Sequence, residues 1–189
     1  MKKKLLALAA LGVVFALNTN AQTDDKDDNH TVSINIPEVA ILDLEGKTAI
    51  SLNVEAPTEA GEAVDFSKAK DSSIWLNYSS IVSKKENSRD VSVKISKNDV
   101  PDGMLLKVTA SSDAGNGDGT MGKSTGTVTL TNKDQKVIDG IGSCYTGDGE
   151  KNGHNLNYSL ELDPTKGSYA DIDFDQDVTL TITYTISNK

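Results

Sequence analysis

The sequence has 189 residues, with 28 acidic and 19 basic side chains and a single cysteine. The resulting charge of −9 argues against nucleic acid and anionic lipid as partners, because those polyanions need compensating Lys and Arg. One cysteine excludes an intramolecular disulfide, so the fold must depend on its core and its hydrogen-bonded ladders.

Residues 1–21 have the pattern of a secretory signal peptide. Three lysines precede an apolar run from Leu5 to Leu17, and a short polar stretch then ends in Ala21. The run of about 13 residues is shorter than the roughly 20 that a membrane-spanning helix needs. We predict cleavage after Ala21 and export to the periplasm, the cell surface or the extracellular space. The remaining 168 residues would carry 16 basic and 28 acidic side chains, a charge of −12, and no transmembrane segment is predicted in them.

The mature chain is predicted to begin with a flexible acidic leader, residues 22–30, which lacks large apolar side chains. A single β-domain is then predicted over residues 31–189. Its first strand, half-buried and interrupted by Pro37, is predicted from three alternating apolar residues: Val32, Ile34 and Ile36.

A second strand is predicted over residues 49–54, followed by an irregular segment, residues 58–73, with at most a helical turn near residues 62–69. The strand over residues 74–82 contains the only tryptophan, Trp75. We expect this strand at the centre of the core, with the Trp75 indole as a packing anchor. The alternative is that Trp75 is an exposed platform on which a sugar ring stacks.

Short alternating segments continue along the rest of the chain, separated by turns rich in Gly, Asn and Asp. The glycine-rich residues 111–126 are predicted to form a long surface loop. Further strands are predicted over residues 91–96, 104–111, 127–145 (with a turn at 132–134), 156–164 and 168–174.

The last predicted strand has the clearest two-faced pattern. Its apolar face is expected to pack in the core and its Thr-rich face to meet water, and a slip of one residue would exchange the two faces. The apolar residues are Val178, Leu180, Ile182, Tyr184 and Ile186. In total about nine or ten strands with almost no helical periodicity predict an all-β fold, an antiparallel Ig-like β-sandwich.

Candidates for chemistry are few. Cys144 and His154 are the most specific pair for nucleophilic catalysis, but a base must be held rigidly beside its nucleophile, and His154 is predicted in a loop. The sequence therefore predicts no catalytic, cofactor-binding or metal-ligating residue, and no enzyme.

Four carboxylates stand at alternate positions near the end of the chain. On an extended strand they would share one face. Either calcium would bridge these carboxylates, or they would form a solvated acidic edge that discourages pairing with other sheets. The second interpretation is favoured, and calcium binding stays open. These residues are Asp171, Asp173, Asp175 and Asp177.

The second half of the chain, residues 99–189, resembles secreted bacterial β-sandwich subunits of the pilin and spore-coat-U type. The resemblance is carried by "VPDGMLLKVTA", "GTVTLT", "LNYSLEL" and a Tyr-Thr-rich closing strand after Gly167, Tyr169 and Asp171. It implies a building block or adhesive surface. Many members carry a disulfide, which this chain lacks, and in strand-exchanging pilins an alternating N-terminal segment, here residues 32–36, joins a neighbouring sheet.

The sequence thus predicts an exported, non-enzymatic β-sandwich protein with a structural or adhesive role at the cell surface, a pilin-like or coat-like subunit. Its expected partners are further copies of itself or other surface proteins. The alternative function is a carbohydrate-binding module that would hold a glycan through Trp75 and two loop aromatics, Tyr145 and Tyr158.

Overall fold

The computed structural model describes residues 26–86, 88–165, 169–173 and 177–189, so the predicted signal peptide lies outside the described residues. The chain divides into two units, one that ends at Asn35 and one from Ile36 to Lys189. In the first unit, residues 26–35 are exposed and belong to no strand. The described part of the chain contains no helix with the length and apolar character needed to cross a membrane.

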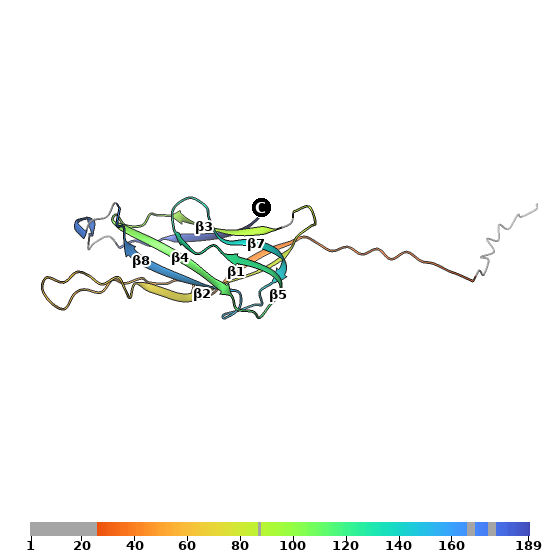
Figure 1. Ribbon diagram of the computed structural model, residues 1–189, viewed down its shortest axis with the longest axis horizontal. Coiled ribbons are helices and arrows are strands. Elements are labelled where there is room, and N and C mark those ends of the chain that lie inside the picture. Colours follow the sequence, from red (N-terminus) through yellow and green to blue (C-terminus); the bar gives the residue numbers. More distant parts are fainter. Residues whose placement is uncertain (1–25, 87, 166–168, 174–176) are drawn as a thin grey trace, which may run out of the picture. The chain divides into compact units, whose positions relative to one another are not determined.

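The second unit is all-β, as predicted. Nine strands form an antiparallel sheet, and a short 3₁₀ helix, Tyr169–Asp171, is the one helical element of the described residues (Figure 1). The strands are β1 Val39–Gly46, β2 Lys70–Ile81, β3 Arg89–Lys97, β4 Met104–Asp113, β5 Asp118–Ser124, β6 Thr127–Thr129, β7 Gln135–Tyr145, β8 His154–Leu162 and β9 Thr181–Asn188.

The strand order is β6-β4-β8-β2-β7-β3-β9, with β1 added to β2 and β5 added to β7. Strand β2 is the centre of this arrangement. It pairs with β1 over residues 74–81, with β8 over residues 70–76 and with β7 at Ser79 and Ser80. Because a strand has two edges and β1 occupies one of them, β8 and β7 divide the other edge between them.

A single core lies against one face of these strands. Strands from all parts of the sheet contribute fully buried apolar side chains to this core. Alternation of apolar and polar residues along each strand directs the apolar side chains to this one face. Burial of each such side chain contributes about 1.5–3 kcal/mol. The most completely buried members are Leu76, Val91, Val93, Val108, Val137, Ile138, Ile141 and Leu156.

Two tyrosines join strands that are far apart in the order. The hydroxyl groups of Tyr158 in β8 and Tyr184 in β9 lie 2.7 Å apart, although β2, β7 and β3 separate these strands in the sheet. Both side chains are buried. The sheet therefore curls until the inner faces of β8 and β9 meet across the core.

The buried tyrosines predict a loss of stability in alkali. Burial raises the pKa of Tyr158 to about 12, although the hydrogen bond with Tyr184 opposes this, and burial also raises the pKa of Tyr184. Unfolded tyrosine loses its proton near pH 10, so between about pH 10 and 12 the unfolded state binds fewer protons than the folded state. The free energy of unfolding should therefore fall by roughly 2–3 kcal/mol across this window because of Tyr158.

Urea unfolding between pH 8 and pH 11.5 measures this effect. Tyr158→Phe should flatten the fall, whereas Phe in place of the exposed Tyr169 should leave it unchanged. An identical slope in wild type and Tyr158→Phe would show that Tyr158 is not a source of the pH dependence.

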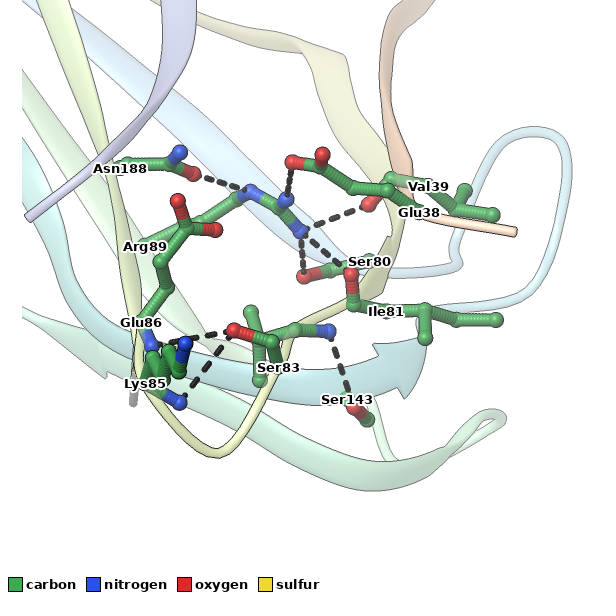
Figure 2. Close-up of polar contacts among 11 residues, drawn as sticks. Glu38, Val39, Ser80, Ile81, Ser83, Lys85, Glu86, Arg89, Ser143 and Asn188 are labelled. Carbon is green, nitrogen blue, oxygen red and sulfur yellow. Dashed lines mark hydrogen bonds and ion pairs between the residues drawn. The ribbon is translucent and has the colours of Figure 1, made fainter. Parts of the chain in front are cut away.

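Arg89, the first residue of β3, is a buried cross-link at one end of the fold (Figure 2). Its side chain is 1% exposed. The guanidinium donates to the Val39 carbonyl at 2.7 Å, to the Asn188 side chain at 2.8 Å, and to the Ser80 hydroxyl at 3.0 Å. It also donates to the Ile81 carbonyl and to the Glu38 carboxylate. One side chain thus fixes the start of β1 and the ends of β2 and β9.

The final strand confirms its predicted pattern. From Thr181 onward β9 pairs with β3, and Ile182, Tyr184 and Ile186 belong to the core or pack against it. Val178, at the predicted start of the strand, is exposed and precedes the ladder.

The predicted strand over residues 32–36 is absent. No strand includes these residues, and β1 begins after Pro37, at Val39. The side chains of Val32, Ile34 and Ile36 are 70%, 84% and 71% exposed. An alternating pattern favours an extended backbone, but a strand also needs a partner, and the described part of this chain supplies none here.

Two irregular segments also differ from the predictions. Residues 49–54 form no ladder, although Ile50 and Leu52 pack against the core. The glycine-rich segment 111–126, predicted as a loop, contains β5, which pairs with β7. Glycine is required in β5, because a Cβ on Gly119 would lie 2.2 Å from the Ser143 carbonyl oxygen.

Candidate functional site

The register of β1 and β2 decides which side chains face away from the core. Leu76 and Tyr78 are buried in the core, so their alternating neighbours Trp75, Asn77 and Ser79 lie on the outer face of β2. Trp75 is only partly buried and does not belong to the core cluster. The prediction that its indole anchors the core is therefore wrong.

Three cross-strand rows cross this outer face. The first joins Ile41 of β1, Ser79 of β2 and Tyr145 of β7. The second row lies two residues earlier in β2 and joins Asp43 and Asn77. The third joins Glu45, Trp75 and Asn155 of β8.

The first two rows line an open, shallow cavity of about 240 Å³. Its apolar walls are the two large side chains Tyr145 and Ile41, which are 54% and 64% exposed. Its polar lining residues include Ser79, Asp43 and Asp148. Asn77 also lines it but is 4% exposed, and its amide nitrogen is bonded to the Gly149 carbonyl. An exposed aromatic ring beside groups that form hydrogen bonds is the composition of a ligand site rather than of a solvated sheet surface.

The loop that follows Tyr145 closes one side of this cavity. It is tied to β2 by reciprocal hydrogen bonds, from the Thr146 amide to the Tyr78 carbonyl at 3.1 Å and from the Tyr78 amide to the Thr146 hydroxyl at 3.0 Å. The Asn77 side chain donates to the Gly149 carbonyl at 2.9 Å. These bonds hold Asp148 at the margin of the cavity.

A second cavity of about 670 Å³ lies further along the same face, over β2, β8 and β4. Besides Tyr158, it is lined by polar residues with both donors and acceptors: Lys70, Asp71, Ser72, Ser73, Thr109, Asn157, Ser159 and Glu161. The ladder is irregular here, because β2 has one residue more than β8 between Asp71 and Ile74.

Asp71 in this second cavity is ionised. Burial favours the protonated acid, but hydrogen bonds from the Ser73 hydroxyl and amide and the charge of Lys47 outweigh burial, so the pKa of Asp71 lies below its ordinary value. The Ser73 amide donates to the carboxylate at 2.8 Å. Asp71 is thus a fixed acceptor beside the hydroxyls of Ser72 and Ser73.

Cys144 and His154, the candidate pair that the sequence analysis set aside, share no hydrogen bond among the described contacts. Cys144 is buried, and burial, with a contribution from the charge of Asp113, raises the pKa of its thiol to about 11. His154 is fully buried, with Nδ1 2.8 Å from the Ser111 carbonyl and Nε2 2.7 Å from the Tyr78 hydroxyl. Both ring nitrogens are occupied, and the described contacts include no hydrogen bond between His154 and the thiol, so the thiol is not activated.

The described members of the acidic run belong to no strand. Asp171 ends the 3₁₀ helix, Asp173 and Asp177 have no regular structure, and Asp175 lies outside the described residues. Within the residues that the structure describes, no three His, Cys, Asp or Glu side chains gather in a way that would hold a metal ion.

The three aromatic residues considered for glycan binding lie in different environments. Tyr145 is exposed at the 240 Å³ cavity, Trp75 is partly buried on the same outer face, and Tyr158 is buried in the core. Ile41, Asn77 and Asp148, which also line the cavity, are not marked by any pattern in the sequence. Their contribution depends on pairings between distant segments, which no local pattern reports.

Comparison with known proteins gave no relative, since no family model, no curated protein and no solved structure matches this chain.

Proposed function

We propose that the protein is an exported, non-enzymatic structural subunit with an Ig-like β-sandwich body, which assembles with further copies of itself at the cell surface. The observation that carries this proposal is the exposure of Val32, Ile34 and Ile36 in a segment that belongs to no strand. Three large apolar side chains at alternate positions match one face of a strand. Such a segment gains both hydrogen bonds and apolar burial by adding to a sheet edge of another molecule.

The sandwich part of the proposal is supported by the contact between Tyr158 and Tyr184. Strands at distant positions in the order share one core, as they do when two sheet layers pack face to face. A body that buries its own core in this way does not need the segment 32–36 to complete its fold, so the segment is left for a partner.

Arg89 supports the proposal from the side of the folded body. Glu38 and Val39, which directly follow the exposed segment in the chain, are both held by the Arg89 guanidinium. A strand donated to a neighbour transmits force to the body from which it comes. The buried guanidinium therefore anchors the segment where it leaves β1.

The experiment replaces Ile34 with Asp in the chain that begins at Gln22. Ile34 is 84% exposed, so the body should fold as before, while a charge in an added strand would have to be buried. Wild type is expected to form multimers, and Ile34→Asp is expected to be monomeric, as measured by light scattering after size-exclusion chromatography.

The control variant is Ser33→Asp, which adds the same charge to the polar side of the same segment. It should still form multimers. Monomeric wild-type protein, or multimers that persist in Ile34→Asp, would contradict assembly through this segment.

A further inference from the structure

We propose that the outer face of β1, β2 and β8, with the end of β7 beside it, is a carbohydrate-binding surface, in which the cavity at Tyr145 holds one sugar ring of an extended glycan. This inference goes beyond the proposed structural role and does not depend on assembly. It differs from the sequence prediction in its residues, because Tyr158 is in the core and the pocket is completed by Ile41, Asn77 and Asp148.

The 240 Å³ cavity has the chemistry that a sugar ring needs. A pyranose ring has one apolar face of C–H groups and a rim of hydroxyls. Tyr145 and Ile41 offer apolar surface on opposite sides of the small residue Ser79, to which they are joined in one cross-strand row. The carboxylates of Asp43 and Asp148 accept hydrogen bonds from hydroxyl groups, and such charge-assisted bonds are the strong ones.

The same outer face continues beyond this cavity with further groups that a glycan could contact. Trp75 lies four residues from Ser79 on the outer side of β2, which places it about 13 Å from the Tyr145 row. Beyond it the 670 Å³ cavity presents hydroxyl, amide and carboxylate groups, among them Thr109, Asn157 and Ser159. Aromatic and polar positions thus follow one another along the face, as an oligosaccharide with several rings requires.

The linings of the two cavities also favour one kind of ligand. The smaller cavity has two carboxylates and no basic side chain in its lining, so it does not suit phosphate or nucleic acid. The larger cavity mixes donors with acceptors, and sugar hydroxyls act as both. A neutral, hydroxyl-rich ligand with an apolar face satisfies both cavities, whereas a purely cationic one would leave the donors of the larger cavity unused.

The experiment uses Trp75, the only tryptophan, as an internal reporter in the chain that begins at Gln22. Cellohexaose, xylohexaose, mannohexaose and chitohexaose are titrated while tryptophan fluorescence is recorded, and heats of binding are measured by calorimetry. At least one of these oligosaccharides is expected to bind and to shift the Trp75 emission. Tyr145→Ala is expected to weaken that binding by about tenfold or more, which corresponds to about 1.4 kcal/mol.

Two further variants complete the test. Tyr145→Phe keeps the ring and should retain most of the affinity. Tyr169→Ala removes an equally exposed tyrosine, 50% exposed, from the 3₁₀ helix and should leave binding unchanged. The proposal is overturned if none of the four oligosaccharides binds at millimolar concentration, or if Tyr145→Ala binds as tightly as wild type. These readouts are independent of the multimer measurement, so either proposal can fail alone.

Discussion

Replacement of Arg89 by Ala is expected to lower the free energy of unfolding by about 3–5 kcal/mol. The guanidinium is 1% exposed and donates to five groups, which lie in three places along the chain. Without it, the carbonyls of Val39 and Ile81 lose a buried donor, and the volume of the side chain is left empty. Urea unfolding of wild type and variant at neutral pH measures the difference.

The matched control is Lys94→Ala in the same strand. Lys94 pairs with Asp134 at 3.2 Å, but both side chains are substantially exposed, and such pairs contribute at most about 1 kcal/mol. If Arg89→Ala and Lys94→Ala shifted the urea midpoint equally, the Arg89 cross-link would contribute no more to the free energy of unfolding than an exposed ion pair does.

Replacement of Gly153 by Ala is expected to lower the free energy of unfolding by at least about 3 kcal/mol. Gly153 precedes β8 and has a φ of 64°, which L-residues adopt at a cost. In addition, a Cβ at this position would lie 2.2 Å from the Leu76 carbonyl oxygen in β2. The backbone would have to move apart where β8 joins β2.

Gly149→Ala in the same loop separates these two effects. Gly149 has a φ of 89°, but its nearest neighbour to an added Cβ is the Asn152 side chain at 4.0 Å. This variant should lose only the conformational part, about 1–2 kcal/mol. Equal losses in the two variants would show that close approach of β8 to β2 adds nothing, and urea unfolding again provides the measurement.

The sequence predicts strands well where one face is purely apolar and the other purely polar. In β9 and β3 the alternation allows only the orientation in which the apolar face packs on the core, and the structure shows this orientation. In β2 both faces carry a large apolar residue, Trp75 on one and Leu76 on the other, so the period of two does not decide which faces the core. The contacts of β2 with β1 and β8 decide it, and these involve residues far away in the chain.

The candidate site was predictable only in part. Tyr158 alternates with Leu156 and Leu160, a pattern that already indicates the core. Tyr145 is the last residue of β7, so the alternation of apolar and polar residues does not continue past it. The sequence therefore gives little information on which way its side chain faces. Arg89 looks like part of a polar turn in the sequence, because its acceptors are up to 99 residues away. Long-range hydrogen bonds leave no local signature in composition or spacing.

The position of β3 has a consequence for how the chain acquires its structure. Arg89 in β3 and Asn188 beyond it in β9 are 99 residues apart, and the two strands pair along their length. Such a pairing must close a very large loop before any of its hydrogen bonds forms, and topologies of this kind are slow to form. Until β9 is available, β3 lacks a neighbour on one edge, so the last residues of the chain complete the sheet.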